Sequence, residues 1–144
     1  MQTTRITDSL SVAGQISKED IAALAKDGVA TIINNRPDNE EPGQLAAADA
    51  EAEAKKQGID YRYLPVTTGN ITRAQVAEFE KLVLRSPKPI LAHCRSGTRC
   101  YLMWAAARAL FDRESPLKLV AQAAIKGYDL RSLPNLIERL EAEK

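Results

Sequence analysis

The chain has 144 residues, with 20 basic and 19 acidic side chains, one histidine and two cysteines. This length predicts one domain with one core, and we expect that domain to span residues 1–144. A net charge of +1 gives no electrostatic reason to expect a nucleic acid or an anionic membrane as partner. Zinc hydrolases and zinc fingers need more histidines or cysteines than these, so we expect no metal site and no cofactor.

No segment resembles a membrane span or a signal peptide. The longest apolar run, residues 101–107, is far shorter than the roughly 20 residues that cross a membrane. Met1 to Arg5 contain no apolar stretch of the signal-peptide type. We therefore expect a cytoplasmic protein, in which Cys94 and Cys100 are free thiols rather than a structural disulfide.

In the first half of the chain, short strands alternate with helices. Ser17 and Asp20 have the spacing of a capping box, which starts a helix, and Gly28 ends that helix. The apolar, β-branched run from Val29 to Ile33 is typical of a strand covered on both faces. In chain order we expect strands over residues 5–7 and 10–13, a helix up to Gly28, a strand over 29–33, a helix over 45–57 and a strand over 59–64.

In the second half, helices predominate. Thr72 and Gln75 form a second capping box, and Ser115 followed by Pro116 is a typical helix start. In chain order we expect a helix after Thr72, a strand over residues 90–92, a helix over about 100–111, a helix from Pro116 to Gly127 and a last helix over 134–143. The whole order predicts an α/β fold, with a mostly parallel central sheet of about four to five strands and helices on both faces. Ligands of such folds bind at the carboxyl ends of the strands, where Cys94 lies.

The segment around Cys94 carries the chemistry. A cysteine at the end of a buried strand is followed by a glycine-containing loop and then by a helix. Backbone N–H groups of such a loop, together with the positive end of the helix, form a cradle for an anion. The same field stabilises a thiolate, so we expect the pKa of Cys94 to fall from about 8.5 toward roughly 3.5 to 7.5. We expect the cradle to consist of Arg95, Ser96, Gly97, Thr98 and Arg99.

The residues of this segment have separate expected roles. Gly97 allows torsions that a side chain would disfavour, and Arg99 can form a bidentate pair with an oxyanion. His93 is expected to hold the loop through hydrogen bonds rather than to act as a base, because a thiolate prepared by the helix needs none. Cys100 is either a small packed residue at the helix start or a second thiol that resolves or accepts a persulfide. Arg95 is either solvated or meets substrate at the rim.

Five short segments of the chain are similar to one known family. They are Ser11–Gln15, Ile32–Asp38, Tyr63–Val66, His93–Arg99 and Gly127–Leu130. With these segments, the chain resembles the beta-lactamase-hydrolase-like phosphatase domain family, bacterial proteins similar in fold to dual-specificity protein phosphatases, from about Thr4 to Leu140. The resemblance implies a protein-tyrosine-phosphatase-like fold, a phosphorylated or small oxyanion substrate, Cys94 as nucleophile and Arg99 as anion clamp.

Two departures from the phosphatase pattern bear on activity. Those enzymes place five residues between cysteine and arginine, whereas four intervene here and Cys100 stands where arginine would fall. The loop that carries their aspartate general acid corresponds to residues 65–70, which contain no carboxylate. Protonation of the leaving group is worth roughly 10²- to 10⁴-fold in rate. Asp38 on the neighbouring loop is the candidate replacement, although after Pro37 it also reads as a turn residue.

The tighter loop has a second relative. The pattern Cys-Arg-Ser-Gly-x-Arg, from Cys94 to Arg99, looks like the active loop of rhodaneses, sulfurtransferases that carry sulfur as a persulfide on one cysteine. Such a transfer needs an activated thiolate and an anion cradle, but no protonation of an alkoxide. A rhodanese-type enzyme would move sulfur from thiosulfate or glutathione persulfide to a thiol acceptor.

Three functions therefore remain open: a phosphatase-like hydrolase, a sulfurtransferase, and an anion-binding module without turnover. The polar residues near the site have simpler expected roles. Glu40 and Glu41 are expected to be solvated, and Arg36 to pair either with Asp38 or with substrate. Tyr128 is expected to pack as a ring after a helix end, or to form one wall of the pocket.

Overall fold

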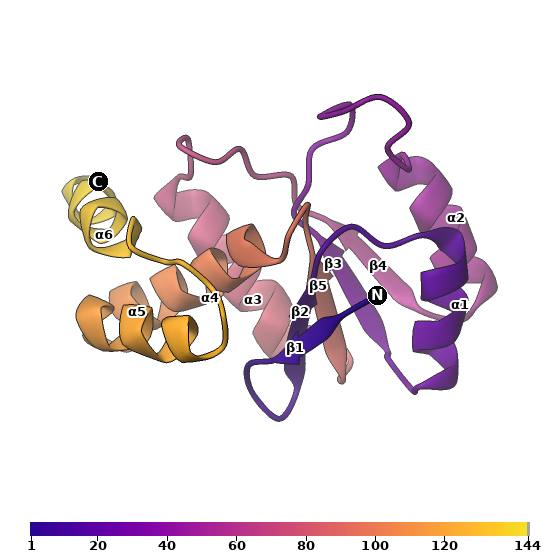
Figure 1. The fold of residues 1–144 in the computed structure, drawn as a ribbon, viewed down its shortest axis with the longest axis horizontal. Coiled ribbons are helices and arrows are strands. Elements are labelled where there is room, and N and C mark those ends of the chain that lie inside the picture. The colour runs from indigo at the N-terminus through magenta and orange to yellow at the C-terminus, as the bar shows by residue number, and fades with distance from the viewer. Residues whose placement is uncertain (144) are drawn as a thin grey trace.

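Five strands form one sheet in the computed structural model, which describes residues 1–143 (Figure 1). Their order across the sheet is β1-β2-β5-β3-β4. Only β1 runs antiparallel to its neighbour, β2, and the other pairs are parallel. The predicted mostly parallel sheet is thus confirmed. The strands are β1 Thr3–Arg5, β2 Leu10–Ala13, β3 Thr31–Asn34, β4 Asp60–Tyr63 and β5 Ile90–His93.

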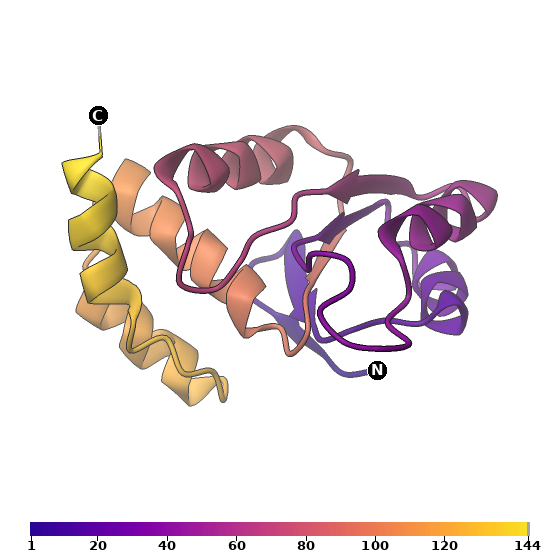
Figure 2. The same ribbon diagram turned by 90° about the horizontal axis from the view of Figure 1, so that it is seen from above.

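The described residues form six helices, four of which cover the two faces of the sheet (Figures 1 and 2). The six helices are α1 Lys18–Lys26, α2 Ala47–Lys56, α3 Arg73–Arg85, α4 Thr98–Phe111, α5 Pro116–Ile125 and α6 Leu133–Ala142. The first two lie on one face, and α3 and α4 lie on the other. Helices α5 and α6 pack against α4, outside the sheet. None of the helices among the described residues is long and apolar enough to cross a membrane.

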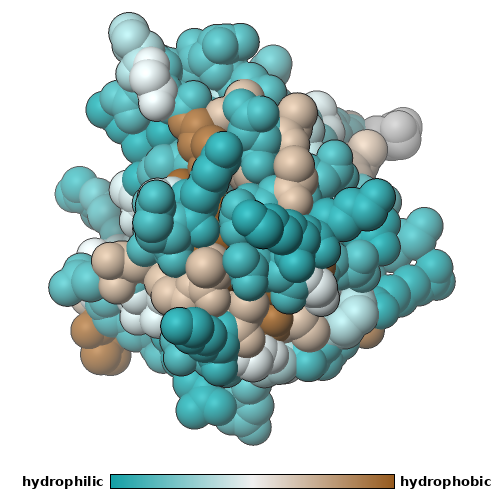
Figure 3. Space-filling model, turned by 90° about the vertical axis from the view of Figure 1, so that its right-hand side faces the viewer, coloured by the Kyte–Doolittle hydropathy of each residue, from teal (hydrophilic) through white to brown (hydrophobic). Residues whose placement is uncertain are grey.

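The core consists of one apolar cluster on each face of the sheet. Consecutive strand residues point to opposite faces, so Ile32 packs with Ile21 of α1 whereas Ile33 packs with Phe79 of α3. All four side chains are fully buried. Burial of each stabilises the fold by about 1.5 to 3 kcal/mol, and coverage of both faces explains why the strand reads as a continuous apolar run. The outer side over α1 and α2 is mainly hydrophilic (Figure 3).

The helix starts are those that the sequence predicts. The Ser17 hydroxyl accepts from the Asp20 amide at 3.1 Å, and the Asp20 carboxylate accepts from the Ser17 amide at 2.9 Å. Thr72 and Gln75 form the same reciprocal pair at the start of α3. Ser115 caps α5, whose first residue is Pro116.

Several predicted boundaries differ by one or two residues from the observed ones, and two of the differences have a visible cause. The first strand covers residues 3–5 rather than 5–7, because Thr7 turns the chain: its hydroxyl accepts from the amides of Ser9 and Leu10. Helix α4 begins at Thr98 rather than near residue 100, because Gly97 adopts a left-handed conformation with φ 93° and becomes the residue that precedes the helix. The thiol loop is therefore one short turn.

The sheet register brings three loops to one edge. Ala13, Asn34 and His93 end β2, β3 and β5 at the same level, because Ala13 pairs with His93 and His93 pairs with Asn34. The loops that follow these strands meet at the upper edge of the sheet in Figure 1. Residues far apart in the sequence thus surround Cys94, which directly follows β5.

Candidate active site

Cys94 lies under a short backbone turn at the amino end of α4. Its side chain is 1% exposed, and the Gly97 amide donates a hydrogen bond to its sulfur at 3.1 Å. The left-handed torsion of Gly97 makes this contact, since it turns the loop back over the sulfur. A β-carbon on Gly97 would lie 3.1 Å from the Tyr128 hydroxyl. This position therefore requires glycine, because of both its backbone torsion and the close Tyr128 side chain. The Tyr128 ring packs against the core, as predicted.

The loop after β2 supports the turn from the other side. The Gln15 amide donates to the Arg95 carbonyl at 3.2 Å, and a β-carbon on Gly14 would come within 2.9 Å of that oxygen. Gly14 is needed here because the two backbones approach so closely. The Cys94 amide itself donates to the Ala13 carbonyl at 3.3 Å.

The pKa of the Cys94 thiol is lowered to about 5. The largest cause is a hydrogen bond from the Cys100 thiol, and backbone N–H groups of Cys100, Ser96 and Gly97 add to it. Burial acts in the opposite direction, because it disfavours the charged thiolate. Cys94 is thus a thiolate at neutral pH, in the range expected for a cysteine at a helix start.

Cys100 lies in the first turn of α4 and is fully buried. Burial and the neighbouring sulfur raise the pKa of Cys100 well above its ordinary value. The Cys94 thiol therefore ionises first, and the proton stays on Cys100. Both cysteines are free thiols, as predicted. The structure brings the second sulfur to the first, a placement compatible with both of its expected roles.

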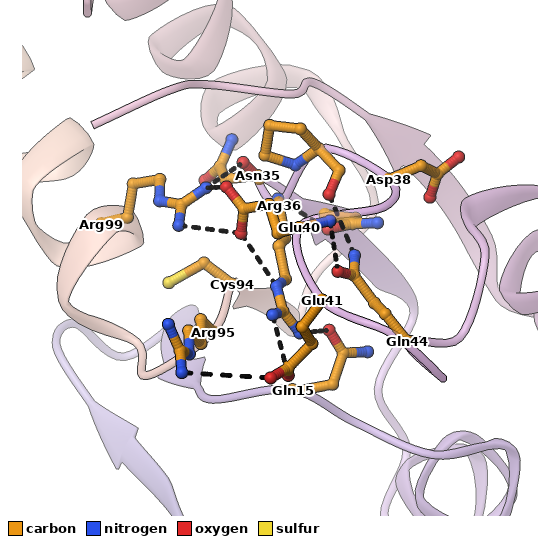
Figure 4. A network of polar contacts seen from close by, with 12 residues as sticks. Gln15, Asn35, Arg36, Asp38, Glu40, Glu41, Gln44, Cys94, Arg95 and Arg99 are labelled. Atoms are coloured by element: carbon orange, nitrogen blue, oxygen red, sulfur yellow. Dashed lines mark hydrogen bonds and ion pairs between the residues drawn. The ribbon is translucent and has the colours of Figure 1, made fainter. Parts of the chain in front are cut away.

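Arg99 is anchored along one edge of its guanidinium. Nη1 donates to the Val66 carbonyl at 2.9 Å and to Glu40 Oε2 at 3.1 Å, and Nη2 donates to Glu40 Oε1 at 3.2 Å. A longer contact of 3.5 Å joins Nη1 to the Asn35 carbonyl. The opposite edge is unpaired at Nε, which is buried and, among residues 1–143, has no hydrogen-bond partner. Figure 4 shows Nη2 on the Cys94 side of the group.

Arg36 links the loop after β3 to the site, in a network that the sequence analysis missed. Its side chain is 1% exposed, and it donates to Glu40 at 2.9 Å, to Glu41 at 2.9 Å and to Gln15 at 3.0 Å (Figure 4). Burial alone would lower the pKa of Arg36, but the two carboxylates outweigh it and raise that pKa. Of its two expected partners, Asp38 is not bound to Arg36, and pairing with substrate stays a prediction.

Glu40 and Glu41 are exposed, as expected, but both form ion pairs with Arg36, which the sequence did not indicate. Burial would raise the pKa of Glu40, but Arg99 and Arg36 lower it. Arg36 lowers the pKa of Glu41 as well. The sequence did contain a signal for these ion pairs. Arg36 follows the end of a buried strand, and Glu40 and Glu41 come four and five positions after it.

The other predicted cradle residues lie at the rim. Arg95 is exposed, and its guanidinium is 3.9 Å from Glu41. The hydroxyls of Ser96 and Thr98 are 3.2 Å apart. These three side chains face solvent beside the turn, whereas the backbone of the turn forms its floor.

Asp38, the candidate general acid, lies apart from Cys94 (Figure 4). Its carboxylate accepts from the Ala47 amide at 2.8 Å, at the start of α2. Helix α2 has no cap of its own, because the residue before it is Ala46. The structure therefore gives Asp38 the part of a helix cap, and it does not bring Asp38 to the nucleophile. The loop over residues 65–70 brings no carboxylate either.

The predicted hydrogen bonds of His93 are not found. Both ring nitrogens are buried and have no partner among residues 1–143. Burial lowers the pKa of His93 to about 4, and the nearby charge of Arg36 acts in the same direction. The ring is therefore neutral, and it supports the loop by packing. Within the same residues, no group of three His, Cys, Asp or Glu side chains is arranged to hold a metal ion.

Comparison with known proteins gives a consistent result. The family model for the beta-lactamase hydrolase-like protein, phosphatase-like domain, matches residues 2–111. A beta-lactamase hydrolase-like protein of Agrobacterium fabrum is 33% identical over 142 residues, 99% of this chain. The chain spans about a third of that relative's length, since the match covers 33% of it.

Solved structures with the same fold are phosphatases or candidates for that role. A candidate phosphatase from Neisseria meningitidis is 32% identical, with a TM-score of 0.82 over 98% of this chain and 97% of its own. The active form of Tk-PTP is 17% identical, with a TM-score of 0.75 over 99% of this chain and 97% of its own. The second likeness shows the fold alone, and it confirms the expected phosphatase-like architecture.

Proposed function

The chain belongs to the family of the beta-lactamase hydrolase-like protein, phosphatase-like domain, and we propose that it hydrolyses phosphate monoesters with Cys94 as the nucleophile. We further propose that residues 1–144 are one domain that carries this site. The observation that supports the mechanism best is the Cys94 sulfur itself. It lies at the amino end of α4, receives the Gly97 amide at 3.1 Å and has a pKa of about 5.

In the proposed reaction, the Cys94 thiolate attacks phosphorus and the ester oxygen leaves, which gives a phosphocysteine. The backbone N–H groups of the turn bind the equatorial oxygens. Arg99 binds two of the same oxygens through its unpaired Nε and through Nη2, because a guanidinium edge matches an oxyanion in a bidentate pair. Water then attacks the phosphocysteine, releases phosphate and restores the thiolate.

Phosphate release and intact mass test this proposal together. The protein is incubated with 4-nitrophenyl phosphate, and free phosphate and any phosphoryl adduct are measured. We expect release that is abolished in Cys94→Ser and retained in Cys100→Ser, which is the matched control for loss of a thiol. Phosphate release that is unchanged in Cys94→Ser would show that Cys94 is not the nucleophile.

A second candidate function is sulfur transfer, which the neighbouring Cys100 thiol favours. Cys94 would attack the outer sulfur of thiosulfate, the sulfur–sulfur bond would break and sulfite would leave, so that Cys94 becomes a persulfide. A thiol such as glutathione would then take the sulfur. This reaction needs no proton donor for an alkoxide, and the Nε and Nη2 edge of Arg99 fits the oxygens of thiosulfate as well.

The same mass measurement separates the two functions. A stable gain of one sulfur from thiosulfate, discharged by glutathione or cyanide and absent in Cys94→Ser, would replace the phosphatase proposal if no ester is hydrolysed. If neither reagent gives an adduct or a product, the chain is an anion-binding module.

A further inference from the structure

Among the loops that follow the strands at this edge of the sheet, one carries all the carboxylates. The loops that follow β2, β4 and β5 at this edge, residues 14–17, 64–72 and 94–97, contain no Asp or Glu. Only the loop after β3 carries them, as Asp38, Glu40 and Glu41. A proton donor of the usual carboxylic type from these loops must therefore be one of these three side chains. Asp129, which follows Tyr128 on the loop between α5 and α6, is paired with Arg131 at 2.8 Å.

All three carboxylates are already engaged. Asp38 caps α2 through the Ala47 amide, away from the sulfur. Glu40 and Glu41 form ion pairs with Arg36, and Glu40 also binds the anchored edge of Arg99. The arginines hold the pKa of both glutamates below its ordinary value, so these groups are ionised when substrate binds.

The remaining polar groups are poor donors too. The His93 ring is neutral and buried. The Cys100 thiol already donates to Cys94, and burial raises its pKa. The Tyr128 hydroxyl is bound to the Thr4 hydroxyl at 3.1 Å. The site thus combines an activated nucleophile and an anion cradle with no free acid among the described residues.

From this combination we infer a substrate class: phosphate groups whose leaving group departs as a stable anion, such as electron-poor aryl phosphates, acyl phosphates and phosphoanhydrides, but not alkyl monoesters. The inference rests on the proposed phosphatase function. The sulfur–phosphorus bond forms as the phosphorus–oxygen bond breaks, and the electron pair leaves with the oxygen, which takes its proton from water afterwards. An alkoxide cannot leave in this way at a useful rate without a donor.

The second half of the reaction needs no acid either. When water attacks the phosphocysteine, the phosphorus–sulfur bond breaks and the electron pair returns to sulfur, while the proton from water passes to the phosphate or to solvent. The Gly97 amide and the Cys100 thiol already stabilise that thiolate. The site therefore stabilises a leaving thiolate, whereas it has no group to protonate a leaving alkoxide.

A series of phosphate compounds that transfer the same phosphoryl group but differ in leaving group tests the inference. We would measure kcat/KM for 2,4-dinitrophenyl, 4-nitrophenyl and phenyl phosphate, for acetyl phosphate and for phosphoserine. General-acid catalysis is worth about 10²- to 10⁴-fold, so we expect the dinitrophenyl ester to exceed the phenyl ester by at least about 100-fold. Acetyl phosphate should react, and phosphoserine should not.

Carboxylate variants supply the control. In Asp38→Asn, Glu40→Gln and Glu41→Gln, the ratio of the dinitrophenyl to the phenyl rate should stay the same, even where both rates fall. A variant that slows the phenyl ester alone would identify a proton donor and overturn the inference, and so would a nearly flat series in the wild-type protein. If no ester yields phosphate or a Cys94 adduct, the phosphatase proposal itself fails, which is a different result.

Discussion

At the scale of single residues, the two edges of the Arg99 guanidinium differ in their partners. Two backbone carbonyls and Glu40 hold the Nη1 and Nη2 edge, while Nε stays buried and unpartnered among residues 1–143. An unpaired buried N–H group costs free energy unless something binds it. The anchored edge thus fixes the guanidinium so that its other edge can take an oxyanion.

Loss of Glu40 should therefore weaken the site. In Glu40→Ala, Arg99 keeps its carbonyl partners but loses both carboxylate contacts, so its Nε edge is no longer held in place. A hydrogen bond between charged groups is worth about 1.5 to 3 kcal/mol, which corresponds to a decrease of about 10- to 100-fold in kcat/KM for aryl phosphates. Glu41→Ala, which leaves Arg99 untouched, is the control. An increase in kcat/KM for Glu40→Ala would instead mean that Glu40 blocks the site.

Cys100 should set the acid limb of the pH profile. Its thiol is the largest cause of the lowered pKa of Cys94, so Cys100→Ala should raise that pKa above about 5. The acid limb of kcat/KM then moves to higher pH, while activity above pH 8 changes little. Cys100→Ser keeps a donor at this place and should keep the profile near that of the wild type. Identical profiles for the alanine variant and the wild type would show that the backbone N–H groups alone stabilise the thiolate.

At the scale of elements, Asp38 belongs to α2. Helix α2 starts at Ala47 without a capping side chain from its own segment, and Asp38 supplies the acceptor from nine residues earlier. Asp38→Ala should lower the free energy of unfolding by about 1 kcal/mol, the usual value of an N-terminal cap, measured by urea unfolding. Hydrolysis of an aryl phosphate by the folded variant should stay near the wild-type rate. A loss of about 100-fold or more without unfolding would restore Asp38 as the general acid.

The elements themselves could be read from the sequence, because their signals are local. The capping boxes of Ser17 and Thr72 and the apolar run before Asn34 each depend on neighbouring residues, and all three are confirmed. The motif from Cys94 to Arg99 was likewise visible as a loop between a strand and a helix.

The parts that were missed depend on contacts between segments. Arg36 with Glu40 and Glu41 looks like an ordinary polar loop until the sheet brings that loop against Arg99. Asp38 follows Pro37 as a turn residue would, and its real partner is the uncapped start of a helix. No pattern of spacing reveals that His93, one residue before the thiolate, has no polar partner among the described residues.

At the scale of the whole molecule, the net charge of the chain can be compared with that of the ion-paired residues at the sheet edge. The chain carries a net charge of +1, and so does the set that meets at the sheet edge, three arginines against two glutamates: Arg36, Arg95, Arg99, Glu40 and Glu41. The Cys94 thiolate then makes the site neutral. We therefore expect anion binding to depend on oriented N–H groups more than on excess charge, and to weaken little with added salt.

Stability should fall as the pH falls, because of His93. Burial holds its pKa at about 4 in the folded chain, against an ordinary value of 6.5, so the unfolded chain binds the proton first. Full stability is present above pH 6.5 and is lost progressively toward pH 4. The gap between the two pKa values, at about 1.4 kcal/mol for each pKa unit, corresponds to about 3.5 kcal/mol of stability.

The Cys94 thiolate acts in the same direction, since its pKa of about 5 also lies below the ordinary value, so the test uses Cys94→Ser protein. Urea unfolding of this variant at pH 7 and pH 5 should show a loss of about 2 kcal/mol, because His93 protonates in the unfolded chain over this interval. Glu40, Glu41 and Asp129 are ionised throughout it, because their lowered pKa values lie beneath pH 5. Replacing His93 with Gln in the same background should flatten the dependence, even if it lowers stability at both pH values. Equal losses in the two proteins would mean that another group binds the proton.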